Sequence, residues 1–327
     1  MTRAFVRFLR CPNTGSSLSV ESLIEKDGRI QEGWLTATTN PELRYPIKQF
    51  IPRFVEPGNY AASFGFQWLR HSDTQYDSVG GVNSSAKRFF EETRWPPQLE
   101  DELILEAGSG AGIFTEHAAS TGATIISFDY SLAVEANYAR NGKLPNVLIL
   151  QADMFHMPFA TGIFDKIFCF GVLQHTPSPE KAFYELVRGL KPGGRIAIDV
   201  YRLGLMGLTK YLVRPVTRTM APERLYKICQ AHVHCLWPVA RLIRKIPKIG
   251  PYLNWLLLVA DYSAWYKLED AKLKEWAVLN TFDMLSPRYD KPQTSRRVAN
   301  WFAKAGLIET DVRHGYNGIE GRGRKPR

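Results

Sequence analysis

The sequence predicts an α/β fold: a doubly wound parallel sheet, with a small β module before it and a helical insert within it. Three observations lead to this fold class. Between residues 101 and 201, short apolar runs alternate with amphipathic helical stretches, which is typical of a parallel sheet covered on both faces. Residues 1–58 contain short β-like runs separated by turn dipeptides. Residues 202–268 interrupt the alternation and have helical character.

The expected elements follow one another in a regular order. We expect strands at 103–107, 123–128, 147–152, 165–170 and 195–201, and helices at 112–120, 131–139 and 179–190. A helix at 294–305, capped by Thr294 and ended by Gly306, then leads to two last strands at 307–314 and 318–327. The main domain is therefore expected to comprise residues 101–201 and 269–327. Residues 59–100, with a helix expected at 84–93, precede it as a linker.

Length and composition are ordinary for a globular protein. The 327 residues suit one domain of roughly 200 to 250 residues with attachments. The N-terminus lacks the apolar stretch of a signal peptide, and no run approaches the roughly 18 to 20 apolar residues of a membrane span. The four cysteines form no C-x-x-C pair, so we expect reduced cysteines and a cytoplasmic protein.

Residues 103–114 (LILEAGSGAGIF) join an apolar strand to a loop with glycines at 108, 110 and 112. Glycines at this spacing let a ligand approach the backbone and expose amide groups at a helix N-terminus. The Walker Gly-Lys-Ser/Thr pattern does not follow, and the loop lacks the third glycine of the dinucleotide fingerprint G-x-G-x-x-G. The loop therefore disfavours a nucleoside triphosphate or a dinucleotide. A tight turn that holds no ligand remains an alternative.

Three acidic residues lie at or near the ends of successive strands. Glu106, just before the loop, would repel a pyrophosphate and favour an ammonium group. Asp129 ends the next strand about 20 residues beyond the loop, where a carboxylate suits ribose hydroxyls. Asp153 follows the third strand and can meet an adenine amino group. A ligand with an ammonium group, a ribose and an adenine but no phosphate is S-adenosylmethionine.

These features, with QADMFHMPF (151–159), FDKIFCFGVLQH (164–175) and LKPGGRI (190–196), resemble class I S-adenosylmethionine-dependent methyltransferases. The resemblance covers residues 101–201 and extends more weakly over 294–327. It implies a Rossmann-like seven-stranded sheet with an antiparallel last strand, S-adenosyl-L-methionine as cofactor and methyltransferase activity. The cofactor-binding residues that it implies are Glu106, Gly108, Ser109, Gly110, Asp129, Tyr130, Asp153, Met154 and Gly171. A doubly wound domain that binds no such ligand is the alternative.

Candidate catalytic residues follow from the chemistry of methyl transfer, in which the enzyme positions the acceptor and, for an oxygen, removes its proton. They are His175 after the fourth strand, His71 in the segment that related enzymes fold as a lid over the cofactor, and Tyr201 just past the fifth strand. His175 is equally consistent with a structural histidine bound to a backbone carbonyl, and His71 with a solvated loop. Residues 280–294 are expected to form a loop that faces the acceptor or packs on the sheet edge.

The N-terminal segments LRCPNTGSSL (9–18) and YPIKQFIPRFV (45–55) resemble the small zinc-ribbon-like modules found beside methyltransferases. Such modules usually carry a C-P-x-C pair, whereas Cys11 is followed by Pro12 and Asn13, and no second pair appears downstream. One cysteine cannot close a tetrahedral zinc site. We therefore expect the shape of the module without its metal.

The net charge of +10 is concentrated in residues 202–268, which hold eleven Lys or Arg against two acids among large apolar residues. Helices of this character suit anionic membranes. In the family that the chain resembles, inserts after the fifth strand commonly cap small-molecule acceptors. We expect O-methylation of a small or lipid-linked acceptor, a saccharide intermediate included, by a cytoplasmic protein that docks on a membrane surface. Three alternatives stay open: a cap with solvated charges, a ribosomal RNA methyltransferase, and a non-catalytic, cofactor-binding regulatory protein docked on a membrane.

Overall fold

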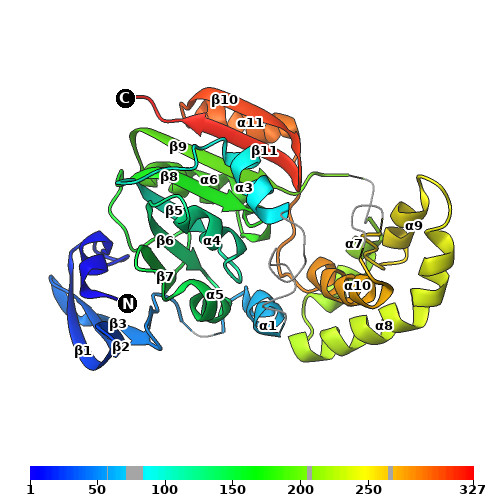
Figure 1. Cartoon of the computed structure of the whole chain (residues 1–327), viewed down its shortest axis with the longest axis horizontal. Helices are drawn as coiled ribbons and strands as arrows, with labels where there is room; N and C mark the ends of the chain where they lie inside the picture. Colours follow the sequence, from blue (N-terminus) through cyan, green and yellow to red (C-terminus); the bar gives the residue numbers. More distant parts are fainter. Residues whose placement is uncertain (57, 71–83, 205–207, 264–267) are drawn as a thin grey trace. The chain divides into compact units, whose positions relative to one another are not determined.

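The computed structural model describes residues 1–56, 58–70, 84–204, 208–263 and 268–327. The chain divides into two compact units (Figure 1). The sheet unit comprises Met1–Asn59, His71–Arg202 and Tyr289–Arg327, and the helical unit comprises Tyr60–Arg70 and Leu203–Arg288. The structure thus groups the start of the expected linker with the insert, and it extends the helical unit to Arg288. The role of the linker as a lid stays a prediction.

The main sheet has seven strands in the order β10-β11-β9-β8-β5-β6-β7. Their bounds are β5 Leu103–Ala107, β6 Thr124–Asp129, β7 Val147–Gln151, β8 Phe164–Phe170, β9 Leu190–Val200, β10 Ile308–Gly315 and β11 Gly318–Arg324. Strands β5 to β9 pair in parallel, and β11 runs antiparallel to both β9 and β10. The predicted seven-stranded doubly wound sheet, with its antiparallel last strand, is confirmed.

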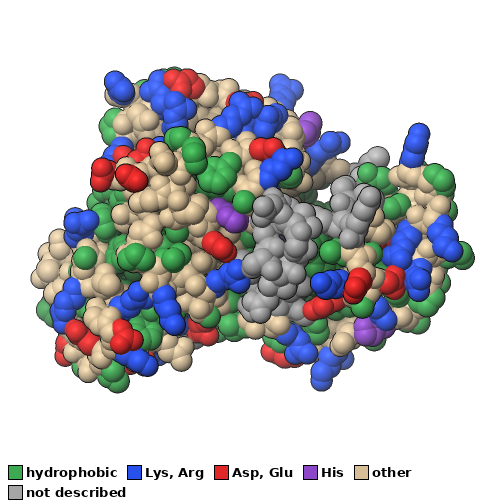
Figure 2. All heavy atoms as spheres, viewed as in Figure 1, with side chains coloured by type: hydrophobic (Ala, Val, Ile, Leu, Met, Phe, Trp, Pro, Cys, Tyr) green, Lys and Arg blue, Asp and Glu red, His purple; other side chains and the backbone are tan. Residues whose placement is uncertain are grey.

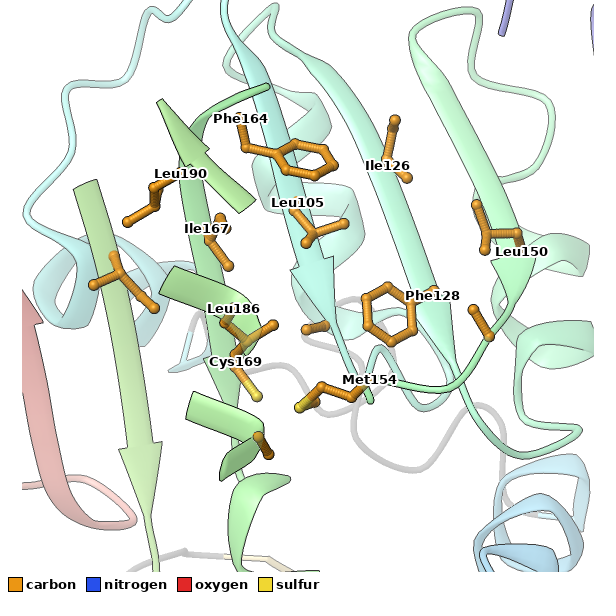
Figure 3. Packing of buried hydrophobic residues seen from close by; sticks show 14 of the residues in the cluster. Leu105, Ile126, Phe128, Leu150, Met154, Phe164, Ile167, Cys169, Leu186 and Leu190 are labelled. Carbon is orange, nitrogen blue, oxygen red and sulfur yellow. The ribbon is translucent and has the colours of Figure 1, made fainter. Parts of the chain in front are cut away.

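Alternate residues of the strands contribute to two hydrophobic cores, one on each face of the sheet, because successive side chains of a strand point to opposite faces. Ile104 joins a cluster with helices α3 (Ser84–Thr93), α4 (Ile113–Ala119) and α5 (Val134–Asn141). Leu105 joins the opposite cluster with α6 (Pro179–Gly189) and α11 (Ser295–Lys304). Figure 3 shows this second cluster, in which Cys169 is fully buried. The expected helices at 84–93 and 294–305 are confirmed, and the Thr294 hydroxyl accepts from the Arg297 amide.

The N-terminal module completes the second of these cores. It is an antiparallel sheet in the order β1-β2-β3-β4, with strands Leu18–Lys26, Arg29–Ala37, Asn40–Lys48 and Ile51–Pro52, preceded by the 3-10 helix η1 (Arg3–Phe8). The connection from β7 to β8 contains no helix, and the module packs there through a bridge between Leu9 and Phe159. Leu35 and Phe128 belong to the same buried cluster. The module therefore covers a part of the main sheet that the helix-free connection between β7 and β8 would leave exposed.

The fold of the module supplies no metal centre in the described part of the chain. The Cys11 sulfur lies 3.2 Å from the Tyr45 hydroxyl. No group of three or more His, Cys, Asp or Glu that could hold a metal ion occurs among the described residues. The resemblance to a zinc ribbon stays a prediction.

The helical unit consists of α1 (Ala62–Arg70), α7 (Leu208–Thr217), α8 (Pro222–Ile243), α9 (Gly250–Leu256) and α10 (Asp270–Leu285). Its core joins Phe66 of α1 to Tyr226 of α8 and Phe282 of α10. The expectation of a loop from residue 280 is wrong, because α10 continues to Leu285 to bury Phe282 and Leu285. None of the helices in the described ranges is long and apolar enough to cross a membrane.

Candidate active site

The glycine loop follows β5 and owes its path to backbone conformations that favour glycine. Gly108, Gly110 and Gly112 have φ values of +81°, +52° and +89°, in the left-handed region that side chains disfavour. A Cβ atom on Gly108 would overlap the side chain of Val172, which follows β8. The loop can therefore approach the residue after β8 because Gly108 carries no side chain.

Backbone hydrogen bonds fix the loop against β6. The amides of Gly108 and Ser109 donate to the Phe128 carbonyl at 2.8 and 3.0 Å. The Gly110 amide donates to Asp129 Oδ2 at 2.9 Å. The predicted loop residues and the predicted ribose-binding carboxylate are thus brought together in one site.

Glu106 lies beneath the loop and is 2% exposed. Its Oε2 accepts hydrogen bonds from the hydroxyls of Ser127, at 2.7 Å, and Thr115. Asn137 donates to both of these hydroxyls. Burial raises the pKa of Glu106 to about 7, although the two hydroxyls act in the opposite direction. The side chain therefore ties β5 to β6 and α4, and its expected contact with an ammonium group stays a prediction.

Asp129 is held at the end of β6 by its own turn. Its Oδ1 accepts from the amide and hydroxyl of Ser131 at 2.8 and 2.7 Å. Burial raises the pKa of Asp129, and the hydrogen bonds oppose that shift. The next carbonyl, of Tyr130, accepts from the side-chain amides of Asn59 and Gln151, and burial also raises the pKa of Tyr130.

Asp153 and Met154 follow β7, next to β6 in the sheet. The carboxylate of Asp153 accepts from the Phe155 amide at 2.9 Å and lies 2.9 Å from His156 Nδ1. The Asp153 side chain is 21% exposed, whereas Met154 is buried against the core (Figure 3). Because parallel strands end at the same edge of a sheet, Asp129 and Asp153 lie at the ligand-binding edge of this topology.

The segment after β8 carries the first catalytic candidate. His175 ends the 3-10 helix η2 (Leu173–His175) and is 7% exposed. Its Nδ1 lies 3.0 Å from the carbonyl oxygen of Tyr289. A carbonyl only accepts, so Nδ1 carries the hydrogen and Nε2 is the basic nitrogen of the neutral ring. The ring of Tyr201 meets the imidazole edge to face, with centroids 5.3 Å apart.

The segment from Tyr289 to Gln293 links the two candidates that the structure describes. The Lys291 amide donates to the Gln174 carbonyl at 2.9 Å, and the Gln293 amide donates to the Tyr201 carbonyl at 2.8 Å. The structure therefore brings His175 and Tyr201 together. The third candidate, His71, lies outside the described residues.

Sequence reasoning missed a buried ionic group beside Gly171. The Gly171 amide donates to Asp199, a fully buried carboxylate of β9 that also pairs with Arg88 of α3. Arg88 Nε donates to Glu92 at 2.5 Å. Burial, followed by the charge of Asp199, raises the pKa of Glu92 to about 9. The spacing of Arg88 and Glu92, four residues apart on an expected helix, is the signal that could have revealed half of this group.

The donor set of the site fits S-adenosylmethionine. Asp129 and Asp153 offer carboxylate oxygens, which accept from hydroxyl and amino groups, at the ends of neighbouring strands. The glycine loop allows close approach of a ligand to the backbone. A third carboxyl group, Glu106, lies below the loop and would oppose a phosphate. The residues present thus match a cationic ligand with a ribose and an adenine.

Comparisons with known proteins agree with this fit. A family model described as a methyltransferase domain matches residues 105–198. The chain is 33% identical over 165 residues to a demethylmenaquinone methyltransferase of Clavibacter sepedonicus, covering 50% of this chain and 67% of that protein. It is 31% identical over 152 residues to the biotin biosynthesis bifunctional protein BioHC of Cellvibrio japonicus, covering 46% and 29%. The chain thus spans less than a third of the length of the Cellvibrio protein.

Among solved structures, an S-adenosylmethionine-dependent methyltransferase from Aquifex aeolicus is similar, with 13% identity and a TM-score of 0.42 over 80% of this chain and 97% of that one. The family match and the curated relatives confirm the predicted enzyme class, and with it S-adenosylmethionine as the cofactor of the domain. The chain belongs to the class I S-adenosylmethionine-dependent methyltransferases.

Proposed function

We propose that the protein methylates an oxygen atom of a small or lipid-linked acceptor, a saccharide intermediate included. The observation that carries the proposal is the hydrogen bond between His175 Nδ1 and the Tyr289 carbonyl. It fixes the tautomer that leaves Nε2 as a base, and an oxygen acceptor needs a base to lose its proton during transfer. Transfer to an already basic nitrogen or to sulfur would place less demand on such a group.

In this proposal the residues at the ends of β5, β6 and β7 bind the cofactor. Asp129 accepts from the ribose hydroxyls, Asp153 and Met154 flank the adenine, and Gly108 and Gly110 leave room for the methionine part. When bound, S-adenosylmethionine supplies a methyl group on a positively charged sulfur. The position of the glycine loop supports these roles, because the Gly110 amide donates to the Asp129 carboxylate at 2.9 Å and so holds the two groups side by side. Gly171 and the residues up to His175 then line the side on which the acceptor is held.

His175 receives the acceptor proton on Nε2, and Tyr201 holds the imidazole plane through their edge-to-face contact. The Tyr289 carbonyl stabilises the imidazolium that results, because both ring nitrogens are donors once the ring is protonated. In this arrangement the protein forms no covalent bond to the acceptor or the cofactor. Most of the rate acceleration comes from orientation of the acceptor oxygen toward the methyl group.

The class of acceptor is supported by two observations. One relative is named for a quinone, demethylmenaquinone. The insert of this chain also combines large apolar residues with an excess of Lys and Arg, a composition suited to amphiphilic molecules with anionic groups. Ribosomal RNA, favoured by net charge alone, and a non-catalytic regulatory role are the competing functions that the experiment must separate.

The experiment measures cofactor affinity and turnover in the same variants. Asp129→Asn is expected to weaken S-adenosylmethionine binding by about 10- to 100-fold in calorimetry, because a hydrogen bond to a charged group contributes about 1.5–3 kcal/mol. His175→Gln is expected to bind the cofactor normally yet to lower kcat at least about a hundredfold. Turnover is read as S-adenosylhomocysteine formed with a membrane lipid extract, with a polar glycolipid fraction and with ribosomal RNA.

Asp101→Asn is the matched control, because Asp101 is an exposed aspartate just before β5. It should leave both affinity and turnover unchanged. Turnover with RNA but with neither lipid fraction would replace the proposed acceptor. Tight cofactor binding without turnover on any fraction would favour the regulatory role, and full activity of His175→Gln would remove the histidine from the chemistry.

A further inference from the structure

Helix α8 of the helical unit has two apolar faces instead of one. Its buried face packs in the core of the unit and consists of Leu225, Tyr226, Cys229, Val233, Trp237 and Ala240. A second set of apolar residues is exposed and advances by three or four positions: Ile228, Ala231, Cys235, Val239 and Leu242. A helix that lies on a protein core normally shows a polar face to solvent. The exposed apolar strip therefore departs from this pattern and indicates a contact surface.

The exposed strip is narrow and well formed. At 3.6 residues per turn its members fall within an arc of about 80°. Leu242 is 68% exposed, Val239 46% and Ile228 45%. Ile246, just beyond the end of the helix, adds a further side chain that is 42% exposed. Exposed apolar residues scattered singly are common, whereas a contiguous exposed apolar patch marks a contact surface.

Positive charge borders the strip. Arg224, Lys227 and Arg241 lie on the exposed side of α8, and Lys245 and Lys248 follow its end. Glu223 is the only acidic residue between positions 222 and 260. Lys227 and Arg241 fall on the same flank of the strip at helical spacing, and Arg241 also pairs with Asp270 of α10, with Nε 3.4 Å from Oδ1. Figure 2 shows Lys and Arg side chains beside hydrophobic ones over the region that Figure 1 labels α8.

The opposite flank is extended by α9. His232 Nε2 of α8 lies 2.9 Å from the Leu257 carbonyl oxygen at the end of α9, so this end is held beside the strip. Leu256 and Leu257 are 44% and 37% exposed there, and Ile249 before α9 is 54% exposed. We call the exposed apolar residues of α8 and α9, with Ile246 and Ile249, the α8–α9 apolar surface.

We propose that the α8–α9 apolar surface docks the protein on an anionic lipid bilayer, with α8 lying in the plane of the interface. An aliphatic strip with a basic flank is the arrangement by which interfacial helices bury apolar side chains while Lys and Arg meet anionic headgroups. Lysine is depleted in the interfaces between proteins. The positive charge alone would also suit nucleic acid. Single-stranded nucleic acid, however, stacks its bases on aromatic side chains, and this strip is aliphatic, so the strip favours lipid.

Docking through the α8–α9 apolar surface does not depend on the identity of the acceptor or on catalysis. It concerns the surface of the helical unit alone, and it adds a location to the family membership already established. Failure of the proposed O-methylation would leave it intact, because vesicle binding is measured without cofactor or acceptor. Loss of vesicle binding would likewise leave the cofactor site untouched.

The test is flotation of the full chain with vesicles of phosphatidylcholine alone and of phosphatidylcholine mixed with phosphatidylglycerol. The wild type should float with the mixed vesicles, and more weakly as salt rises. The double variant Leu242→Glu and Ile246→Glu should lower partitioning at least about tenfold, since it removes apolar burial and adds negative charge. The double variant Lys227→Gln and Lys245→Gln should lower it by about tenfold or more.

Matched controls separate this surface from general effects of charge. Leu23→Glu changes a leucine of β1 that is 60% exposed, and Lys26→Gln with Lys272→Gln removes two exposed lysines elsewhere. Both controls should float like the wild type. Circular dichroism and S-adenosylmethionine binding verify that each variant is folded.

Three results would overturn the proposal. The first is a wild type that stays with the soluble fraction on anionic vesicles at low salt. The second is a dimer in light scattering that the Leu242→Glu and Ile246→Glu variant breaks without any vesicle binding, which would make the surface a contact between copies. The third is binding to ribosomal RNA, but not to vesicles, that the lysine variant abolishes.

Discussion

Glu106 is a buried carboxyl group whose Oε2 atom accepts from two hydroxyls, those of Thr115 and Ser127. At the scale of single residues, this position shows best what the sequence reveals and what it hides. A carboxylate before a glycine loop indicates the ligand class, because it opposes a phosphate. Its partners come from α4 and β6, and only the fold shows that one hydroxyl from each element meets at the same oxygen.

Protonation of Glu106 should make stability depend on pH. Burial raises its pKa from 4.5 to about 7. A carboxyl group with a higher pKa in the folded chain contributes stability that is fully present below its unfolded value and is lost as pH rises through the folded value. The contribution should therefore fall by about 3 kcal/mol between pH 4.5 and pH 7.5. Urea unfolding of the wild type and of Glu106→Gln at several pH values measures it.

The quantity to compare is the difference in free energy of unfolding between wild type and variant, because other titrating groups cancel in it. The wild type should lose stability relative to Glu106→Gln as pH rises. Glu42→Gln, an exposed change in β3, should show no such trend. A difference that stays constant with pH, or grows in favour of the wild type, would contradict the assigned environment.

At the scale of elements, helix α3 is fixed to the sheet by charge as well as by packing. Arg88 pairs with Asp199 of β9 and with Glu92 one turn further along α3, while Phe89 packs on Phe168 of β8. The helix itself could be predicted from its pattern. Its ionic partner could not, because 111 residues separate Arg88 from Asp199 and no local spacing connects them.

Replacing Arg88 should therefore lower the free energy of unfolding far more than replacing its neighbour Lys87. Arg88→Met is expected to lower the free energy of unfolding by about 3–5 kcal/mol, because it leaves Asp199 buried without its counterion. Lys87→Met, next to it on the same helix and 68% exposed, should change stability by less than about 0.5 kcal/mol. Denaturation of both variants and of Arg88→Met with Asp199→Asn measures the effect. Equal losses for Arg88 and Lys87, or no recovery in the double variant, would exclude a specific ion pair.

The same scale shows why most elements could be predicted and one boundary could not. Apolar runs such as residues 147–151 indicate strands directly, since strands buried on both faces carry few polar residues. Residues 280–285 lie close to Pro287 and Pro292, which suggested a loop. Burial of Phe282 and Leu285 in the helical unit outweighs those local signals and extends α10.

At the scale of the whole molecule, the N-terminal module and the main sheet share one buried cluster. Leu35 of β2 is fully buried, and it belongs to the same cluster as Leu148 and Leu150 of β7. The sequence indicated a separate small module at residues 1–58. It favoured packing of this module against the main domain, but it did not indicate that the module would cover the face beside the helix-free connection between β7 and β8.

This shared core predicts a single unfolding transition for the sheet unit. Leu35→Ala should cost about 2–5 kcal/mol and should lower the melting temperature of module and sheet together. Leu23→Ala, at an exposed position of β1, is the control and should have little effect. Differential scanning calorimetry measures both. A separate early transition in Leu35→Ala, with an unchanged main peak, would show that the module folds independently.

Attachment of the module to the sheet limits how this methyltransferase domain can be transplanted. The bridge between Leu9 and Phe159 joins the start of the chain to the connection between β7 and β8. A chimaera that borrows only the family-matched residues 105–198 would leave the apolar face over β6 and β7 without its cover. Protein engineers should therefore treat the first four strands as inseparable from the cofactor-binding half, and should place any fusion junction elsewhere.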